Sequence, residues 1–274
     1  MLKSAIVIIL ALVVQWSFIQ PGYEHDHHLL STLSRAPSSN SMEHLDVVIT
    51  GLFVTNYLSH FLLTKKLLPA ITNMVVQVSS SYHWQSDGEM LMPSNDTSGP
   101  SMPTAARGDY YDFNHRHTSY GNSKLAQVLH ARALARRLEK EGSGVRVVSV
   151  CPSWAATDIA PAGPFRWFVQ TFAFTPGQGI YSALMAMFRP EVKTGDFVGN
   201  TEIVPILAPY VSKNWKVNGV PMRGFILDAA AQVLMMLQRF NFGWYIVETS
   251  PESNDVGLQE GLYVWSEKAI EKYI

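Results

Sequence analysis

Short apolar runs alternate with helix-like segments through the middle of this chain, and this alternation constrains the fold more than any other feature. Three runs rich in β-branched residues are bounded by turn residues, as buried parallel strands are: 45–49, 75–78 and 145–150. Residues 56–68 and 120–141 instead repeat apolar side chains at helical spacing, and they end at Pro69 and Gly142. This order predicts an α/β fold in which right-handed crossovers build a doubly wound parallel sheet.

Composition narrows the classes of function. The 274 residues carry a net charge of −1 and no basic block, so the sequence predicts no nucleic-acid partner. Cys151 is the single cysteine, which excludes an internal disulfide and a cysteine-rich zinc site. His25, His27 and His28 cluster near the N-terminus, but no carboxylate or cysteine stands at a recognised ligand spacing from them. We therefore expect a solvated loop there and no metal site.

The first 44 residues differ from the rest. Lys3 precedes an apolar run over residues 5–14, a pattern typical of a signal peptide or a short membrane anchor within segment 1–20. That interpretation places the protein on a membrane or in the secretory pathway, at the endoplasmic reticulum. The alternative is a buried strand at the edge of the core, in a cytoplasmic protein. Residues 21–44 are predicted to be a polar linker, and residues 45–274 the folded domain.

Tyr120 and Lys124 open the second predicted helix and carry the candidate chemistry. A spacing of four residues puts both side chains on one helical face, which also holds the apolar Val128 and Leu138. A lysine on a packed face is costly to bury unless it has a partner or a function. Its ammonium is expected to lower the pKa of the nearby phenol, which would make the tyrosine an acid and base near neutral pH.

In this order the segments resemble the short-chain dehydrogenase/reductase family of the classical type, and its retinol-dehydrogenase-like members in particular. The resemblance covers roughly residues 45–274. Residues 55–64, Thr-Asn-Tyr-Leu-Ser-His-Phe-Leu-Leu-Thr, look like the helix whose asparagine supports a proton-relay water. Residues 78–83, Val-Ser-Ser-Ser-Tyr-His, look like the strand end that presents the catalytic serine. Residues 151–158, Cys-Pro-Ser-Trp-Ala-Ala-Thr-Asp, resemble the turn whose threonine contacts the nicotinamide carboxamide.

The resemblance implies two overlapping sets of site residues. The catalytic set is Asn56, Ser80, Tyr120 and Lys124. The cofactor-binding set is Tyr120, Lys124, Pro152 and Thr157. In the family the serine hydrogen-bonds the substrate oxygen, the tyrosine exchanges the proton, and the lysine also holds the nicotinamide ribose. Ser79 and Ser81 are the alternatives to Ser80 in this register, and Cys151 is interpreted as a packed residue rather than a nucleophile.

Three departures from the family pattern affect the cofactor. No Gly-x-x-x-Gly-x-Gly precedes Tyr120, so the expected Rossmann-like sheet is incomplete and lacks the first βαβ half with its phosphate-binding loop. The residue that would choose NADP or NAD is missing with that half. Residues 50–54 lead almost directly into the next helix, where the family has a longer connection. Ser153 replaces a turn glycine.

The sequence therefore predicts an NADP- or NAD-dependent oxidoreductase that transfers hydride between the cofactor and a carbonyl or secondary alcohol. The aromatic and Met-rich region 165–274 suits a small lipophilic substrate such as a retinoid, steroid or fatty alcohol. One rival is a catalytically impaired remnant that serves at most as a binding or interaction module. A sugar-nucleotide epimerase is another, since it shares Tyr-x-x-x-Lys. Monomer and homo-oligomer both stay open.

Overall fold

The computed structural model describes most of the predicted domain. The described residues are 53–86, 88–91, 116–153, 155–157, 164–199, 216–217, 220–221 and 244–274. Segments 1–20 and 21–44 and the predicted strand 45–49 lie outside them, so the domain boundary stays a prediction. Across the residues that are described, no helix is both long enough and apolar enough to cross a membrane.

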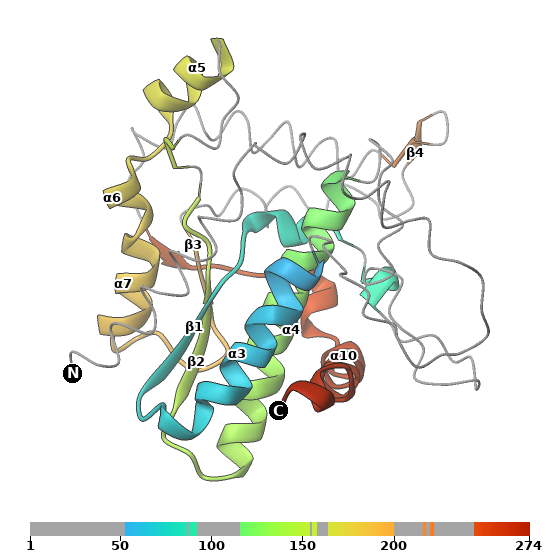
Figure 1. Ribbon diagram of the computed structural model, residues 1–274. Coiled ribbons are helices and arrows are strands. Elements are labelled where there is room, and N and C mark those ends of the chain that lie inside the picture. The colour runs from blue at the N-terminus through green and yellow to red at the C-terminus, as the bar shows by residue number, and fades with distance from the viewer. Residues whose placement is uncertain are drawn as a thin grey trace.

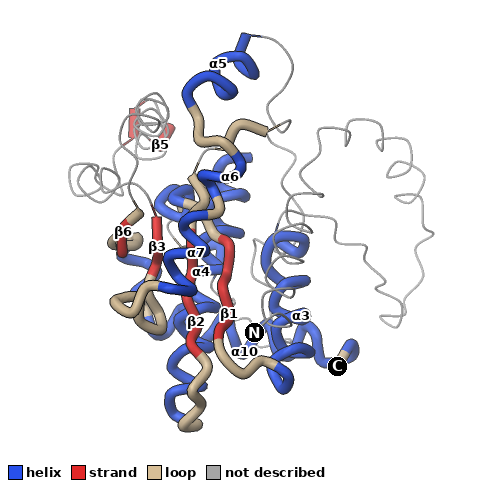
Figure 2. The backbone as a smooth tube through the Cα atoms, turned by 90° about the vertical axis from the view of Figure 1, so that its left-hand side faces the viewer, coloured by secondary structure: helices blue, strands red, loops and turns tan. Residues whose placement is uncertain are grey.

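A four-stranded sheet forms the centre of the molecule (Figure 1). Its strands are β1 (Met74–Val78), β2 (Arg146–Val150), β3 (Phe197–Gly199) and β6 (Tyr245–Ile246), in the order β1-β2-β3-β6. Figure 2 shows them side by side in this order. β1, β2 and β3 are parallel and β6 is antiparallel. The predicted parallel pairing of runs 75–78 and 145–150 is confirmed. The two-residue strands β4 (Lys216–Val217) and β5 (Val220–Pro221) pair separately.

Three helical elements cover one face of the sheet. They are the π-helical turn η2 (Val54–Leu58) with α3 (Ser59–Leu67), the long α4 (Arg116–Lys140), and α10 (Val256–Ile270). Short 3-10 turns adjoin them: η3 (Leu68–Ala70), η4 (Ser81–Gln85), η5 (Glu89–Leu91), η9 (Pro251–Asn254) and η10 (Glu271–Tyr273). Both predicted helices are present, although α4 begins at Arg116, one turn before Tyr120.

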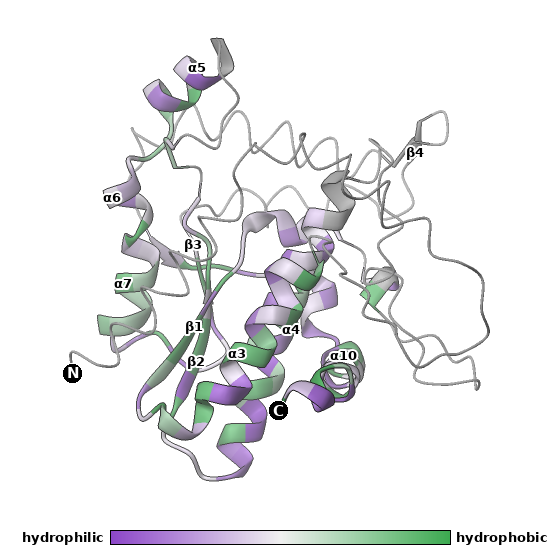
Figure 3. Ribbon diagram, viewed as in Figure 1, coloured by the Kyte–Doolittle hydropathy of each residue, from purple (hydrophilic) through white to green (hydrophobic). Residues whose placement is uncertain are grey.

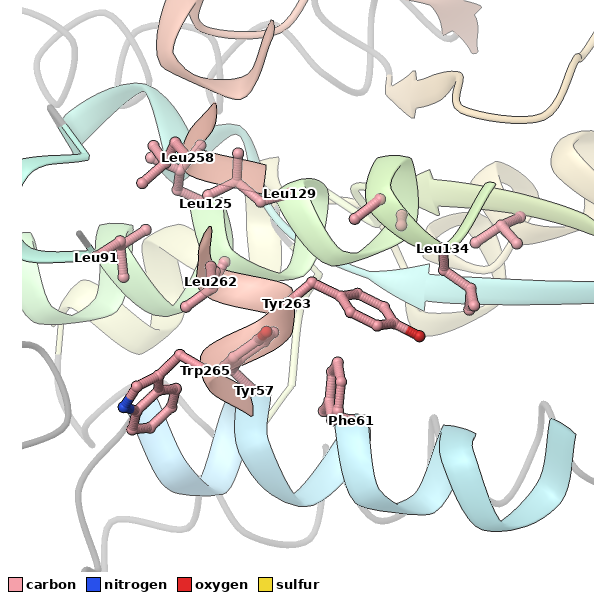
Figure 4. Close-up of a cluster of buried hydrophobic side chains, with 14 of the residues drawn as sticks. Tyr57, Phe61, Leu91, Leu125, Leu129, Leu134, Leu258, Leu262, Tyr263 and Trp265 are labelled. Carbon is pink, nitrogen blue, oxygen red and sulfur yellow. The ribbon is translucent and has the colours of Figure 1, made fainter. Parts of the chain in front are cut away.

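The main apolar core lies between these helices and the sheet. Figure 4 shows the rings of Tyr57, Phe61 and Tyr263 close together, with leucines of α4 and α10 beside them. Phe61 is fully buried, and its ring lies 5.1 Å from that of Tyr263. On the outside of this contact, Arg136 and Arg137 of α4 pair with Glu260 of α10. These ion pairs are partly exposed, so apolar burial rather than charge stabilises the docking of α10.

A second, smaller core covers the opposite face. Helix α7 (Tyr181–Phe188) packs there, and α6 (Pro176–Gly179) precedes it; α5 (Pro164–Phe172) lies beyond the end of the sheet in Figure 1. Ala183 and Ala186 of α7 pack on Val76 of β1. Because helices pack on both faces, β1 and β2 are mostly hydrophobic, as Figure 3 shows. The described part is thus an incomplete Rossmann-like α/β fold.

Candidate active site

The three serines after β1 have different partners. The Ser79 hydroxyl donates to the Lys124 carbonyl at 2.7 Å, and Ser81 donates through its amide and its hydroxyl to the Cys151 sulfur. Ser80 caps η4, where its hydroxyl accepts from the Tyr82 amide at 3.2 Å, and it also hydrogen-bonds the Tyr120 side chain. Ser80 is therefore the serine that meets the tyrosine, as its register predicted, while its catalytic role stays a prediction.

Tyr120 lies half-buried near the N-terminal end of α4. Burial raises the pKa of its phenol, the nearby Cys151 raises the pKa further, and the hydrogen bond with Ser80 lowers it. The net direction is upward. The expectation that the pKa of this phenol would be lowered toward neutral pH is therefore wrong, because the cost of burying a phenolate exceeds the stabilisation that the hydrogen bond supplies. The phenol therefore keeps its proton at neutral pH in the absence of a ligand.

Lys124 is buried to 1% exposure one turn further along α4. Its Nζ lies 5.3 Å from the centroid of the Tyr120 ring and donates to two neutral acceptors, the Val78 carbonyl at 3.3 Å and Gln127 Oε1 at 3.1 Å. Burial lowers the pKa of this ammonium to about 7, against a smaller rise from Cys151. Near neutral pH the lysine is therefore divided between its charged and its neutral form.

Asn56 reaches the same helix from the other side. It lies in the π-helical turn η2, an irregularity frequent at functional sites. Its side-chain amide donates to Ser123 Oγ at 3.1 Å, and Ser123 Oγ donates to the Tyr120 carbonyl at 2.8 Å. Its backbone carbonyl accepts from the side-chain amide of Gln127. All four residues of the predicted catalytic set thus belong to one connected region.

The predicted cofactor turn leaves the carboxyl end of β2, beside the strand end that carries Ser80. Pro152 and Thr157 are half-buried there, and the Thr157 hydroxyl donates locally to the Ala155 carbonyl at 3.5 Å. Ser153 has a φ of 61°, and it is the non-glycine residue with a positive φ in the described chain. The serine therefore keeps a backbone shape that glycine adopts without strain. The role of Pro152 and Thr157 toward a cofactor stays a prediction.

Cys151 joins the two strand ends. The residue is buried to 3% exposure, and its sulfur accepts from the amides of Ser81 and Ser153 at 3.3 and 3.4 Å. This agrees with its interpretation as a packed residue. A hydrogen-bonded sulfur here fixes the turn after β1 against the turn after β2.

Sequence reasoning missed Gln127 and His83. Gln127 lies on the packed face of α4, three residues after Lys124, and a polar residue among apolar ones was the available signal. His83 is fully buried; its Nδ1 bonds the Ser80 carbonyl at 2.7 Å, and its Nε2 accepts from the Ser250 amide at 3.1 Å. No local sequence pattern predicts the hydrogen bond between His83 and Ser250, which are 167 residues apart. His83 ties the turn at Ser80 to the C-terminal segment.

Comparison with known proteins gives sequence relatives but no matching family model. The chain is 32% identical over 123 residues to the short-chain dehydrogenase TIC 32 A, chloroplastic, of Brassica napus, covering 40% of this chain and 34% of that protein. It is 31% identical over 155 residues to human polyprenol dehydrogenase, covering 52% and 42%. It is 32% identical over 137 residues to human retinol dehydrogenase 11, covering 47% and 38%. The chain therefore matches less than half the length of each of these relatives.

Proposed function

We propose that this chain, a relative of the short-chain dehydrogenases/reductases, transfers hydride between a nicotinamide cofactor and a carbonyl or secondary alcohol. By resemblance it is an oxidoreductase of that type; the nicotinamide cofactor and the substrate are the parts proposed here. One observation carries the proposal. The Ser80 hydroxyl bonds the Tyr120 phenol beside the buried Lys124, where two parallel strands end. Open α/β sheets bind their ligands at that edge.

The three side chains have distinct proposed roles. Ser80 would donate a hydrogen bond from its hydroxyl to the substrate oxygen and so hold that oxygen against Tyr120 Oη. Tyr120, whose raised pKa keeps it protonated, would give its proton to the oxygen as negative charge develops there. Lys124 would supply positive charge next to the phenol, and it can do so most fully below about pH 7. These roles favour reduction of a carbonyl.

The residues present fit the nicotinamide end of a cofactor. Lys124 has three N–H bonds and, among the described residues, two acceptors, which leaves one donor for a ribose hydroxyl. Thr157 would face the carboxamide from the neighbouring strand end. The bound cofactor would supply the hydride. The residues that would bind the cofactor phosphates are not identified, because the sequence carries no Gly-x-x-x-Gly-x-Gly before Tyr120.

A lipophilic substrate is supported by two observations. The relatives named above include a polyprenol and a retinol dehydrogenase. In this chain, α5 follows the cofactor turn and exposes Trp167 to 65%. A large exposed aromatic side chain on the helix that follows this turn in the sequence suits a long apolar substrate.

The test is reduction of a panel of lipophilic aldehydes and ketones by NADPH or NADH at millimolar concentration. The parent chain is compared with Tyr120→Phe and with Tyr181→Phe, a control on the exposed part of α7. A chimaera that adds a glycine-rich segment from a relative is assayed beside them. We expect turnover in the chimaera that falls by about 100-fold or more in Tyr120→Phe and is unchanged in the control. Turnover that survives Tyr120→Phe, or a chimaera that binds cofactor but never reacts, would refute the proposal.

A further inference from the structure

The side chain of Gln127 lies between Lys124 and Asn56. Its Oε1 accepts from Lys124 Nζ at 3.1 Å, and its Nε2 donates to the backbone carbonyl of Asn56. The residue is buried to 1% exposure, between α4 and the turn η2. A single amide therefore connects the lysine of α4 to the π-helical turn of the preceding element.

Both ends of this amide are used, and that fixes its orientation. A buried amide costs free energy unless its donors and its acceptor find partners. Here the Nε2 amide donates to a carbonyl and Oε1 accepts from the ammonium. A rotation of the amide by 180° would place N–H donors against the ammonium and two oxygens against each other. Gln127 therefore has one satisfied orientation, and the Lys124 ammonium has one position relative to it.

The surroundings of Lys124 make this contact matter. Within the described chain no carboxylate pairs with its ammonium; the acceptors are the Val78 carbonyl and Gln127 Oε1. The other groups that face it are the Tyr120 ring, Cys151 and His60, whose own pKa is lowered by burial and then by the lysine charge. Gln127 is thus one of two neutral groups that stabilise the charged form.

We propose that Gln127 is a positioning residue that holds the Lys124 ammonium beside Tyr120 and thereby helps to set when the lysine is charged. Its importance for catalysis rests on the proposed function, whereas its effect on the lysine does not. The backbone carbonyl of Asn56 anchors the far end of Gln127, so the π-helical turn acts on Lys124 through this amide.

The experiment measures the titration of Lys124 by NMR in the full chain with isotope-labelled lysine, and Lys124→Arg assigns the signal. Gln127→Glu puts a carboxylate beside the ammonium and should raise the midpoint by more than one pH unit. Gln127→Leu removes the acceptor and should lower the midpoint by half a unit or more, by the same principle. Gln77→Leu is the matched control, since Gln77 is a buried glutamine bonded to Thr64 and His130.

A midpoint that stays at the parent value in Gln127→Glu, in a folded protein, overturns the proposal, and so does an equal shift in Gln77→Leu. Should Gln127→Leu fail to fold, Gln127→Glu and Gln127→Asn still decide, because Asn is one methylene too short to span the two partners. Turnover of the chimaera is measured separately. Shifts at Lys124 without Tyr120-dependent turnover would keep the positioning role and refute the proposed function.

Discussion

Two buried histidines should make this protein sensitive to mild acid. His83 bonds the Ser80 carbonyl and the Ser250 amide, and burial first of all lowers its pKa to about 4. His130 packs against the Phe61 ring at 4.7 Å, and its Nδ1 meets Gln77 at 3.4 Å. Burial, followed by the charges of Lys65 and His60, lowers the pKa of His130 to about 3. Both rings are neutral in the folded protein at neutral pH.

The sign of the effect follows from the unfolded state, where both histidines titrate near their ordinary value of 6.5. Above that pH neither state binds a proton, and the free energy of unfolding is unaffected. Below it the unfolded chain binds protons that the folded chain refuses, so stability falls by up to about 1.4 kcal/mol per pH unit and per histidine. At pH 4.5 the two together cost about 5 kcal/mol, which is comparable to the whole stability of a marginal domain, about 5–15 kcal/mol.

The assay is urea unfolding at several pH values between 7.5 and 4.5, with His130→Phe as the test variant. Phenylalanine fits the same ring cluster and cannot titrate, so the variant should lose about 2 kcal/mol less than the parent between pH 6.5 and 4.5. Tyr263→Phe alters the same cluster without removing a group that titrates in this range, and it should keep the parent's slope. Equal acid losses in the parent and in His130→Phe would refute the reasoning.

Ser153→Gly should stabilise the protein by about 1 kcal/mol in urea unfolding, since glycine removes the cost of a φ of 61°; a loss of stability would mean that the serine side chain contributes more than the strain. Asp255→Ala should destabilise by about 1 kcal/mol, because the aspartate caps α10 by accepting from the Leu258 amide at 3.0 Å; an unchanged unfolding midpoint would contradict this. Deletion of residues 1–20 should release the protein from the membrane fraction without changing its urea midpoint; release with a loss of folding would favour the core-strand interpretation.

Local patterns predicted most of the fold because they depend on short-range physics. The β-branched runs became β1 and β2, both with hydrophobic residues facing two helical layers. The Thr175–Gln178 capping box begins α6, a local sequence signal of the same short-range kind. The predicted strand 45–49 and the N-terminal segments lie outside the described residues, and those predictions stand untested.

The sequence predicted which of the candidate residues lie together, and it did not predict their energetics; their roles stay predictions. The spacing of Tyr120 and Lys124 placed them on one helical face, and the register of the serines favoured Ser80. The pKa of Tyr120 could not be predicted, because it depends on how completely the surrounding elements exclude water. The roles of Gln127 and His83 depend on partners 71 and 167 residues away, which no local pattern encodes.

The same burial acts on the two central groups in opposite directions. Burial raises the pKa of Tyr120 and lowers the pKa of Lys124 to about 7. In the ligand-free protein, burial therefore favours the neutral phenol and the neutral amine. The fold thus prepares both groups for the proposed acid–base chemistry, whereas the sequence carries no Gly-x-x-x-Gly-x-Gly before Tyr120 to hold the cofactor phosphates. Phosphate binding normally uses several backbone amides at a helix N-terminus, and each hydrogen bond to the phosphate contributes about 1.5–3 kcal/mol. The loss of three such bonds would reduce the free energy of cofactor binding by about 5–9 kcal/mol. That is about three to six orders of magnitude in affinity. A glycine-rich segment added to the chain should therefore raise the affinity for the cofactor. In the absence of cofactor, the titration midpoint of Lys124 should stay at the value of the parent chain, because Gln127 sets it. A large shift of that titration in the cofactor-free chimaera would show that the missing segment builds the site itself.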